Sequence, residues 1–305
     1  MPKKLILIDG NAFMHRAYHA LPKTLTLPDG TLVNALYGFS SFLIHMMEIE
    51  KPDYIAITFD HKAPTFRHLE FVSYKATRQK APDDFYSQIP LIRDSLTALN
   101  VQQFSLPGYE SDDLIGSIHE KFKSYEDLKF VIYTGDHDLM QLIDKNTEIA
   151  MPISGFKKIN YIDEAKFQEK YGFPATKIID YKALRGDSSD NIPGVKGIGE
   201  KTAVKLLQKF PNLEEIYLNI NEVEPKISDK LKQSKENAYL SKKLATLCLD
   251  INLNIDLEDL KISQINTENL IKFFEKFQFK SLIARIKRIS HYLSQKIDEK
   301  QTSMF

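Results

Sequence analysis

The sequence predicts an α/β fold, in which helices flank a mostly parallel central sheet and a smaller, mostly helical region follows. Two observations indicate this. Short apolar runs rich in β-branched or aromatic residues alternate with amphipathic stretches in the first half of the chain. From about residue 181 onward the strand signals fade and helical patterns dominate. A length of 305 residues accommodates one large domain or two smaller ones.

Three buried strands are predicted in the first half, at Leu5–Ile8, Tyr54–Phe59 and Phe130–Tyr133. Between the first two, residues 35–49 place apolar side chains at helical spacing. The stretch from about His61 to Pro90 is different, because it is polar, contains prolines and is rich in lysine and arginine. An excursion of that length from a sheet is usually functional or disordered.

The second half predicts helices, at Thr202–Phe210, Asn237–Leu249 and Thr267–Phe277. A glycine-rich turn over residues 194–199 precedes the first of them. We therefore expect an α/β core over residues 1–180 that carries the excursion at 61–90. A helical domain over 181–290 and a loose polar tail over 291–305 are expected to follow.

The composition narrows the class of protein. A hydrophobic fraction of 43% is sufficient for a core, and 41 basic residues balance 41 acidic ones, which excludes a simple polycationic nucleic-acid coat protein. The single cysteine, Cys248, excludes an intramolecular disulfide and a cysteine-based zinc site, and it fits a reducing compartment. No apolar run approaches the ~20 residues of a membrane span, and the N-terminus shows no signal-peptide pattern. We expect a soluble cytoplasmic protein with no membrane partner.

Acidic side chains follow each predicted strand. In an open α/β sheet ligands bind outside the carboxyl ends of the strands, so acids at that edge are expected to lie close together. Two further acidic clusters occur in loop-like or helix-start contexts. The candidate acids are Asp9, Asp60, Glu110, Asp112, Asp113, Asp136, Asp138, Asp187 and Asp190.

Convergence of so many carboxylates would cause severe repulsion unless cations were present, and hard divalent ions with oxygen ligands are the natural remedy. A two-metal site can clamp the attacking and leaving oxygens of a phosphodiester displacement. Taken singly, each acid is better explained as a cap or turn residue: Asp112 and Asp113 could cap a helix, and Asp187 could begin an Asx turn. The five clusters together favour a metal site.

The order of these motifs resembles the 5′-nuclease (flap endonuclease) superfamily, and most closely the 5′→3′ exonuclease domain of bacterial DNA polymerase I. The resemblance spans residues 4–279. It is carried by Leu7–Asn11, Phe59-Asp60, Phe66–His68 with Tyr74-Lys75, Pro107–Asp113, Thr134–Leu139 and Leu184–Ala203. It implies a PIN-like core and a helical DNA-binding domain with a helix–two-turn–helix motif, either as a stand-alone nuclease or as an excised domain.

The resemblance also implies two metal sites for Mg²⁺ or Mn²⁺. Asp9, Asp60, Asp112 and Asp113 would serve the first, with Glu110 in support. Asp136, Asp138, Asp187 and Asp190 would serve the second.

The excursion over residues 61–90 resembles the helical arch or gateway of this family. Lys75 and Arg78, with Arg67, would supply countercharge to the scissile phosphate, and Tyr74 would stack on an unpaired base. The alternative for these residues is a solvated, mobile surface loop.

Residues 194–205 resemble the helix–two-turn–helix segment, where family members place a K⁺ ion between backbone carbonyls and DNA phosphate. Two glycines allow close backbone approach, and a helix N-terminus follows. The expected DNA-binding residues are Lys196, Gly197, Gly199, Lys201, Thr202 and Lys205. The alternative is a plain packing corner between helices. Such contacts position a duplex without reading its sequence, so structure-selective binding is expected.

The last five residues resemble the bacterial sliding-clamp-binding peptide, with Gln301 followed by polar residues and the apolar pair Met304 and Phe305. The whole pattern predicts a monomeric, metal-dependent 5′→3′ exonuclease and 5′-flap endonuclease. Its partners would be DNA with 5′ flaps, nicks or free 5′ ends, and RNA–DNA primers. Two alternatives stay open: a DNA-structure-binding protein with weak or no nuclease activity, and a toxin-type or RNA-processing nuclease with a similar acidic core.

Overall fold

The computed structural model describes residues 2–156 and 158–290, so the predicted clamp-binding peptide lies outside the described residues. A six-stranded sheet has the order β3-β2-β1-β4-β5-β6. All neighbouring strands are parallel except the antiparallel pair β5 and β6. The strands are β1 (Lys3–Asp9), β2 (Tyr54–Thr58), β3 (Gln102–Phe104), β4 (Leu128–Tyr133), β5 (Thr147–Ser154) and β6 (Lys158–Ile162). The predicted α/β class and the three predicted strands are confirmed.

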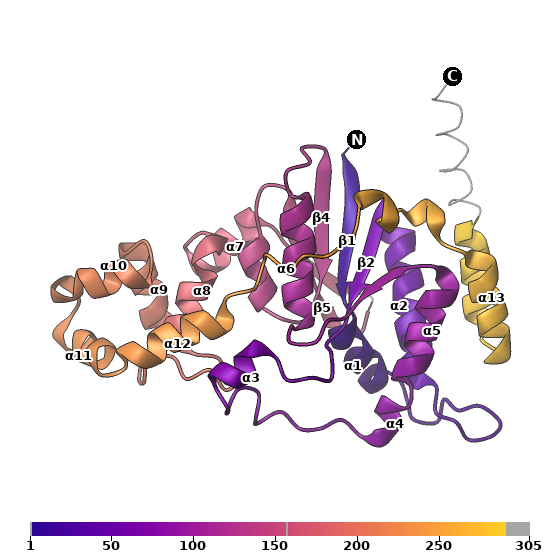
Figure 1. Cartoon of the computed structure of the whole chain (residues 1–305), viewed down its shortest axis with the longest axis horizontal. Coiled ribbons are helices and arrows are strands. Elements are labelled where there is room, and N and C mark those ends of the chain that lie inside the picture. Colours follow the sequence, from indigo (N-terminus) through magenta and orange to yellow (C-terminus); the bar gives the residue numbers. More distant parts are fainter. Residues whose placement is uncertain (1, 157, 291–305) are drawn as a thin grey trace.

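Helices cover both faces of the sheet and extend beyond it on one side (Figure 1). They are α1 (Gly10–Ala20), α2 (Asn34–Glu50), α3 (Phe66–Glu70), α4 (Asp83–Tyr86), α5 (Ile89–Leu99), α6 (Ser111–Phe122), α7 (Glu164–Tyr171), α8 (Ile178–Arg185), α9 (Glu200–Lys209), α10 (Leu213–Leu218), α11 (Pro225–Gln233), α12 (Lys235–Ala245) and α13 (Thr267–Lys276). Short 3₁₀ turns lie at Asp138–Leu142, Ala175–Lys177, Ile220–Glu222, Leu257–Leu260 and Ile262–Gln264.

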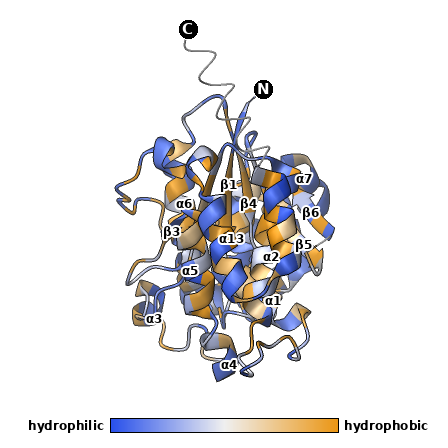
Figure 2. Ribbon diagram, turned by 90° about the vertical axis from the view of Figure 1, so that its right-hand side faces the viewer, coloured by the Kyte–Doolittle hydropathy of each residue, from blue (hydrophilic) through white to orange (hydrophobic). Residues whose placement is uncertain are grey.

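The two-residue period of β1 separates the two cores. Leu5 and Leu7 join the cluster on the α6 face, whereas Ile6 and Ile8 join the cluster that packs against α1, α2 and α5. All four side chains are completely buried, as expected for a central parallel strand covered by helices on both faces. Figure 2 shows the alternation as apolar strands enclosed by helices whose polar sides face outward.

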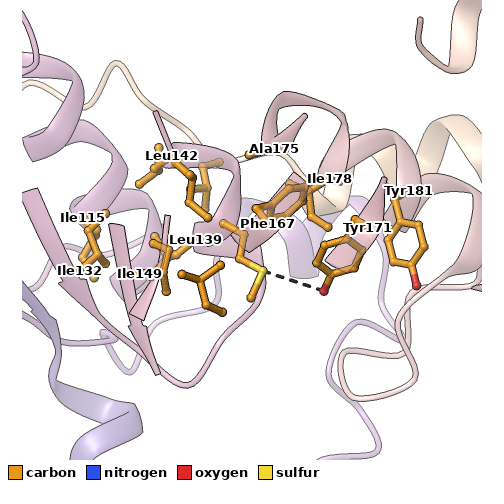
Figure 3. Close-up of a cluster of buried hydrophobic side chains, with 14 of the residues drawn as sticks. Ile115, Ile132, Leu139, Leu142, Ile149, Phe167, Tyr171, Ala175, Ile178 and Tyr181 are labelled. Carbon is orange, nitrogen blue, oxygen red and sulfur yellow. Dashed lines mark hydrogen bonds between the residues drawn. The ribbon is translucent and has the colours of Figure 1, made fainter. Parts of the chain in front are cut away.

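The core on the α6 face continues without a break into the helical region. Ile132 and Ile149 of the sheet, Leu139 of the following 3₁₀ turn, and Phe167 and Tyr181 of the helices belong to one buried cluster (Figure 3). The α8 helix, which is followed in the chain by Asp187 and Asp190, is therefore held against the sheet by apolar packing.

Within residues 181–290, for which the sequence predicts a helical domain, the helices pack in two places. Helices α8 to α12 form a body beside the sheet (Figure 1), whereas α13 packs against α5. Phe274, Leu282 and Ile286 lie in the same buried cluster as Ile6 of the sheet. The helix expected over 237–249 ends at Ala245, and the chain beyond it runs extended along α6 with Cys248 and Ile251 bonded to its side chains.

The basic excursion lies across the carboxyl edge of the sheet (Figure 1). It contains the two short helices α3 and α4, joined by a segment without regular structure. Its far end is held by Asp84, which contacts Tyr18 and Lys23, and by Gln88, whose amide bonds Asn34. Among the described residues, no helix has the length and apolar character required to cross a membrane.

Candidate metal centre

The acidic edge begins where β1 meets α1. Asp9 is the last residue of β1 and the N-cap of α1, and its carboxylate accepts a hydrogen bond from the Ala12 N–H at 3.2 Å. The next residue has to be glycine, because a Cβ at Gly10 would lie 2.3 Å from the Phe59 ring. This junction lies at the β1–β4 boundary, where the strand order reverses and α/β folds place their ligands.

Asp60 and Asp112 join Asp9 through the first turn of α6. Ser111 donates its backbone N–H to Asp60 at 2.8 Å and its hydroxyl to Asp9 at 3.2 Å. Burial, followed by the charge of Asp60, raises the pKa of Asp9 to about 7. Burial and the charges of Asp136 and Asp9 raise the pKa of Asp112 well above its usual value. We call Asp9, Asp60 and Asp112 the first acid group.

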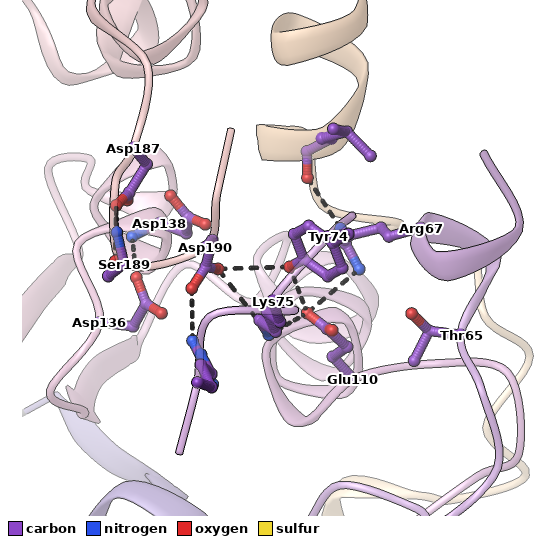
Figure 4. Close-up of polar contacts among 12 residues, drawn as sticks. Thr65, Arg67, Tyr74, Lys75, Glu110, Asp136, Asp138, Asp187, Ser189 and Asp190 are labelled. Carbon is purple, nitrogen blue, oxygen red and sulfur yellow. Dashed lines mark hydrogen bonds and ion pairs between the residues drawn. The ribbon is translucent and has the colours of Figure 1, made fainter. Parts of the chain in front are cut away.

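Four further acids form a second acid group, consisting of Asp136, Asp138, Asp187 and Asp190. The first two follow β4, and the last two follow α8. Asp136, Asp138 and Asp190 each offer an oxygen within 4.8 Å of the others. Figure 4 shows the four side chains of the second group on one side and Glu110 on the other, with Lys75 between them.

Both groups meet at one cavity of about 620 Å³. Six of the nine predicted acids line it, namely Asp9, Asp60, Glu110, Asp112, Asp136 and Asp187. Asp138 and Asp190 are buried beside Asp136, with exposures of 7% and 2%. The structure therefore brings together eight of the nine acids that the sequence nominated, from segments up to 181 residues apart between Asp9 and Asp190.

Asp113 differs from the other eight. It is completely buried and forms a two-pronged ion pair with Arg67, with contacts of 2.7 and 2.8 Å. Its carboxylate also accepts the backbone N–H groups of Glu110 and Cys248. The sequence analysis expected Asp113 as a metal ligand and Arg67 as a countercharge to the scissile phosphate. Instead, Asp113 faces protein donors. Arg67 is only 2% exposed and does not line the cavity.

Two residues of the excursion reach the cavity. The Lys75 ammonium lies 2.8 Å from Glu110 and 3.8 Å from Asp190, and Arg78 lies 2.5 Å from Asp190. Lys75 has a positive φ of 55°, and its backbone N–H bonds the Asp190 carbonyl. The contacts of Lys75 and Arg78 with Asp190 hold the excursion against the second acid group.

Tyr74 is placed differently from the expected stacking surface. Its side chain is 3% exposed, and its hydroxyl lies 3.0 Å from Glu110 and 3.3 Å from Asp190. Burial and these two carboxylates raise the pKa of the Tyr74 hydroxyl, so it stays a neutral donor. In this conformation its ring is not available to a nucleobase.

The glycine-rich turn leads directly into α9. Gly197 has a φ of 80°, and its carbonyl accepts a hydrogen bond from Lys230 of α11 at 2.9 Å. Gly199 is the N-cap of α9. The three lysines Lys196, Lys201 and Lys205 and both glycines are exposed, and Thr202 is half-buried in the first turn of α9. None of these six residues lines the acidic cavity, but Glu200, directly after Gly199, does.

Sequence reasoning did not nominate Lys182, Ser111 and Thr134. Thr134 donates its hydroxyl to Asp9 at 3.3 Å, and Lys182 of α8 lies among the second acid group. Ser111 and Thr134 adjoin the acidic motifs, so proximity in sequence was a usable signal. Lys182 carried a weaker signal, namely its i,i+4 spacing from the buried Ile178 on one face of α8.

Residues 4–172 match the family model of the 5′-3′ exonuclease N-terminal resolvase-like domain, and residues 173–268 match that of the 5′-3′ exonuclease C-terminal SAM fold. The chain belongs to the 5′-3′ exonuclease family. The 5′-3′ exonuclease of Aquifex aeolicus is 35% identical over 294 residues, which cover 96% of this chain and 99% of that protein. This exonuclease is accordingly a hydrolase of phosphodiester bonds.

The chain is also similar to part of a longer relative and to two solved structures. DNA polymerase I of Caldicellulosiruptor bescii is 44% identical over 285 residues. These residues make up 93% of this chain, which spans 33% of the length of that polymerase. A bacteriophage T5 D15 flap endonuclease complex with DNA and metal ions shares the fold with a TM-score of 0.67 at 18% identity, covering 96% of this chain and all of that one. The catalytic core of Rad2 in complex with DNA substrate has a similar fold, with a TM-score of 0.57 at 13% sequence identity. The match covers 93% of each chain.

The acid groups of the exonuclease suit divalent cations. Among the described residues, Asp112 Oδ1 is buried without a hydrogen-bond partner, and no lysine or arginine lies within 4.0 Å of Asp9, Asp60 or Asp112. A buried carboxylate oxygen without a partner is costly, and a hard cation with oxygen ligands relieves that cost. The donor set therefore fits Mg²⁺ or Mn²⁺ better than a softer metal.

The raised pKa of Asp9 predicts a pH-dependent stability in the metal-free exonuclease. Because the folded-state pKa of about 7 exceeds the ordinary aspartate pKa of 3.8, folding takes up a proton between these pH values. The free energy of unfolding then falls as pH rises through this window, and the penalty is complete above pH 7. Asp9→Asn, which keeps a capping side chain, is expected to raise the free energy of unfolding by on the order of 2 kcal/mol at pH 8 and little at pH 4.

Urea unfolding with chelator at both pH values measures this effect. Asp163→Asn is the matched control, because Asp163 is also an N-cap aspartate, of α7, but is exposed. Equal stabilisation by Asp9→Asn at pH 4 and pH 8 would contradict the assignment of a raised pKa.

Proposed function

We propose that this member of the 5′-3′ exonuclease family is a divalent-metal-dependent 5′→3′ exonuclease and 5′-flap endonuclease. The supporting observation is the cavity at the carboxyl edge, where two acid groups converge and Asp112 Oδ1 is buried without a partner. The family membership supplies the reaction class. The 5′-flap substrate is proposed because the T5 D15 flap endonuclease has a similar fold.

The first acid group, with Glu110 in support, would hold one Mg²⁺ or Mn²⁺ ion, and the second group would hold another. When bound, the ions would supply an activated water and stabilise charge on the attacking and leaving oxygens. The bond between phosphorus and the 3′ oxygen breaks, which leaves a 5′-phosphate on one product and a 3′-hydroxyl on the other. Asp113 is proposed to orient the start of α6 through its bond to the Glu110 N–H.

The excursion would guide the 5′ end to the acids. Lys75 and Arg78 already point into the cavity, so they would face the scissile phosphate once their carboxylate partners bind cations. Tyr74 and Arg67 are proposed to hold the base of the excursion, since both are buried in contacts with Glu110 or Asp113. Closing residues 61–90 over the cavity would favour a free 5′ end over an internal site.

The exposed turn before α9 would bind the duplex. Backbone N–H groups at a helix N-terminus attract phosphate, and Lys196, Lys201 and Lys205 add charge around it. A K⁺ ion is proposed at this turn, bound by its backbone carbonyls. Because such contacts involve the phosphate backbone alone, the exonuclease would select substrates by shape.

The proposed substrates are 5′ flaps, nicked or gapped duplexes, and RNA primers on DNA. The DNA polymerase I relatives suggest a place in replication and repair for a monomeric cytoplasmic enzyme. Gln301, Met304 and Phe305 are proposed to dock on a sliding clamp.

A cleavage assay tests the proposal. The purified chain is incubated with 5′-labelled flap DNA, a matched 3′-flap duplex and single-stranded RNA of the same sequence, with Mg²⁺ and then with excess chelator. We expect cleavage of the 5′ flap alone, abolished by chelator. Binding of flap DNA without cleavage would identify a DNA-structure-binding protein, and preferential cutting of RNA would identify an RNA-processing nuclease. Repeating the assay with sliding clamp, with and without residues 301–305, tests that partner.

A further inference from the structure

Lys182 occupies an unusual position inside the second acid group. Its side chain is 6% exposed, although lysine is almost never fully buried unless it is paired. Its ammonium contacts Asp138, lies 2.9 Å from Asp187 and lies 3.9 Å from Asp136. The Lys182 ammonium thus interacts with three of the four carboxylates of the second acid group.

The backbone around Lys182 holds it there. Helix α8 packs against α12, and its neighbours Tyr181 and Ala183 are buried in the main core. The Lys182 carbonyl accepts the Gly186 N–H at 2.8 Å, directly before Asp187. The Lys182 ammonium is therefore positioned by a helix that is packed into the core, and not by a mobile surface segment.

The two acid groups are unequal in this respect. Within residues 2–156 and 158–290, the three carboxylates of the first acid group have no lysine or arginine within 4.0 Å, and only the supporting Glu110 is paired, with Lys75 at 2.8 Å and Arg67 at 3.5 Å. The second group is partly neutralised by Lys182, together with Lys75 and Arg78 at Asp190. A divalent ion entering the second group must displace an ammonium that already satisfies Asp138 and Asp187.

We propose that Lys182 is a positioning residue that makes the second acid group the weaker of two cation sites and so sets the order in which they fill. This rests on the proposed function, since it assumes that both groups bind divalent ions. Once displaced, the Lys182 ammonium remains in the lining of the cavity, where a substrate phosphate can receive it. The second ion would then be favoured when a phosphate is present to accept the displaced charge.

Titration of the DNA-free protein with Mn²⁺, followed by the electron paramagnetic resonance signal of the free ion, tests this directly. Wild type is expected to show a tighter and a weaker class of sites. In Lys182→Met the weaker class should tighten by about thirty-fold or more, because removing a unit charge about 4 Å from a divalent ion removes a repulsion of about 2 kcal/mol even in a water-like dielectric. The tighter class should change by less than about two-fold, because Lys182 has no contact with the first group.

Lys170→Met is the matched control. Lys170 lines the same cavity but is exposed, and no ion pair joins it to an acid of the described chain, so its loss should leave both classes within about two-fold. Lys182→Arg retains the positive charge and should keep the weaker class weak. Lys182→Gln replaces Lys182→Met should the latter fail to give a cooperative thermal transition.

The outcomes separate two failures. An unchanged weaker class in the folded Lys182→Met or Lys182→Gln protein would make Lys182 a purely structural bridge and overturn the inference. Mn²⁺ binding that persists unchanged in both Asp9→Asn and Asp136→Asn would instead overturn the proposed metal sites.

Discussion

Asp136→Asn is expected to reduce cleavage of a 5′-flap substrate by about 10³-fold or more, the scale on which metal-assisted stabilisation of a transition state operates. Asp136 belongs to the second acid group, and its charge also acts on the first. Its charge contributes to the raised pKa values of both Asp9 and Asp112, and it shares a 4.8 Å cluster with Asp138 and Asp190. Replacing one oxygen by an amide nitrogen at this position should weaken cation binding on both sides.

Single-turnover cleavage with saturating Mg²⁺ measures the loss, and fluorescence anisotropy with labelled flap DNA in chelator measures binding. Binding should stay within about three-fold of wild type, since the proposed duplex contacts lie on the separate turn before α9. Asp144→Asn is the control, because Asp144 follows the same strand but does not line the cavity. A wild-type rate for Asp136→Asn would show that the second acid group does not take part in the reaction.

Arg67→Met is expected to lower the free energy of unfolding by about 3–5 kcal/mol, because it leaves the carboxylate of Asp113 buried without its countercharge. Arg67 donates to both Asp113 oxygens and to the carbonyls of Leu244 and Thr246. The cluster joins the base of the excursion, the start of α6 and the segment after α12, three parts that are distant in sequence. Their relative placement depends on one guanidinium.

Urea unfolding provides the measurement, and Lys243→Met provides the control. Lys243 also joins α12 to α3, through an ion pair with Glu70 of 2.7 Å, but both side chains are about half exposed. Its loss should cost about 0.5 kcal/mol or less. If Arg67→Met were no more destabilising than Lys243→Met, the cluster would not be the structural joint that we describe. Arg67→Met/Asp113→Leu, which removes both charges, should recover part of the stability.

The strands and most acids were predictable from the sequence for a local reason. A buried parallel strand needs a continuous apolar run, and the residue after it lies at the carboxyl edge wherever the strand sits in the sheet. Asp9, Asp60 and Asp136 could therefore be assigned to one edge without knowing the strand order. Asp187 and Asp190 follow no predicted strand; the sequence marked them only as a further acidic cluster, and their position depends on the packing of α8.

Tertiary structure decided the roles that depend on partners from distant segments. Asp112 and Asp113 are neighbours in one helical turn, yet side chains at adjacent helical positions point about 100° apart, so one faces the cavity and the other faces Arg67. Tyr74 and Lys75 are adjacent in the excursion, and only the packing on Glu110 and Asp190 separates a buried phenol from a cavity-lining ammonium. The sequence determined by itself eight of the acids that meet at the sheet edge. Which of them are neutralised by the protein, as the second acid group is by Lys182, was decided by helix packing, because the Coulomb interaction depends on distances that chain order does not contain.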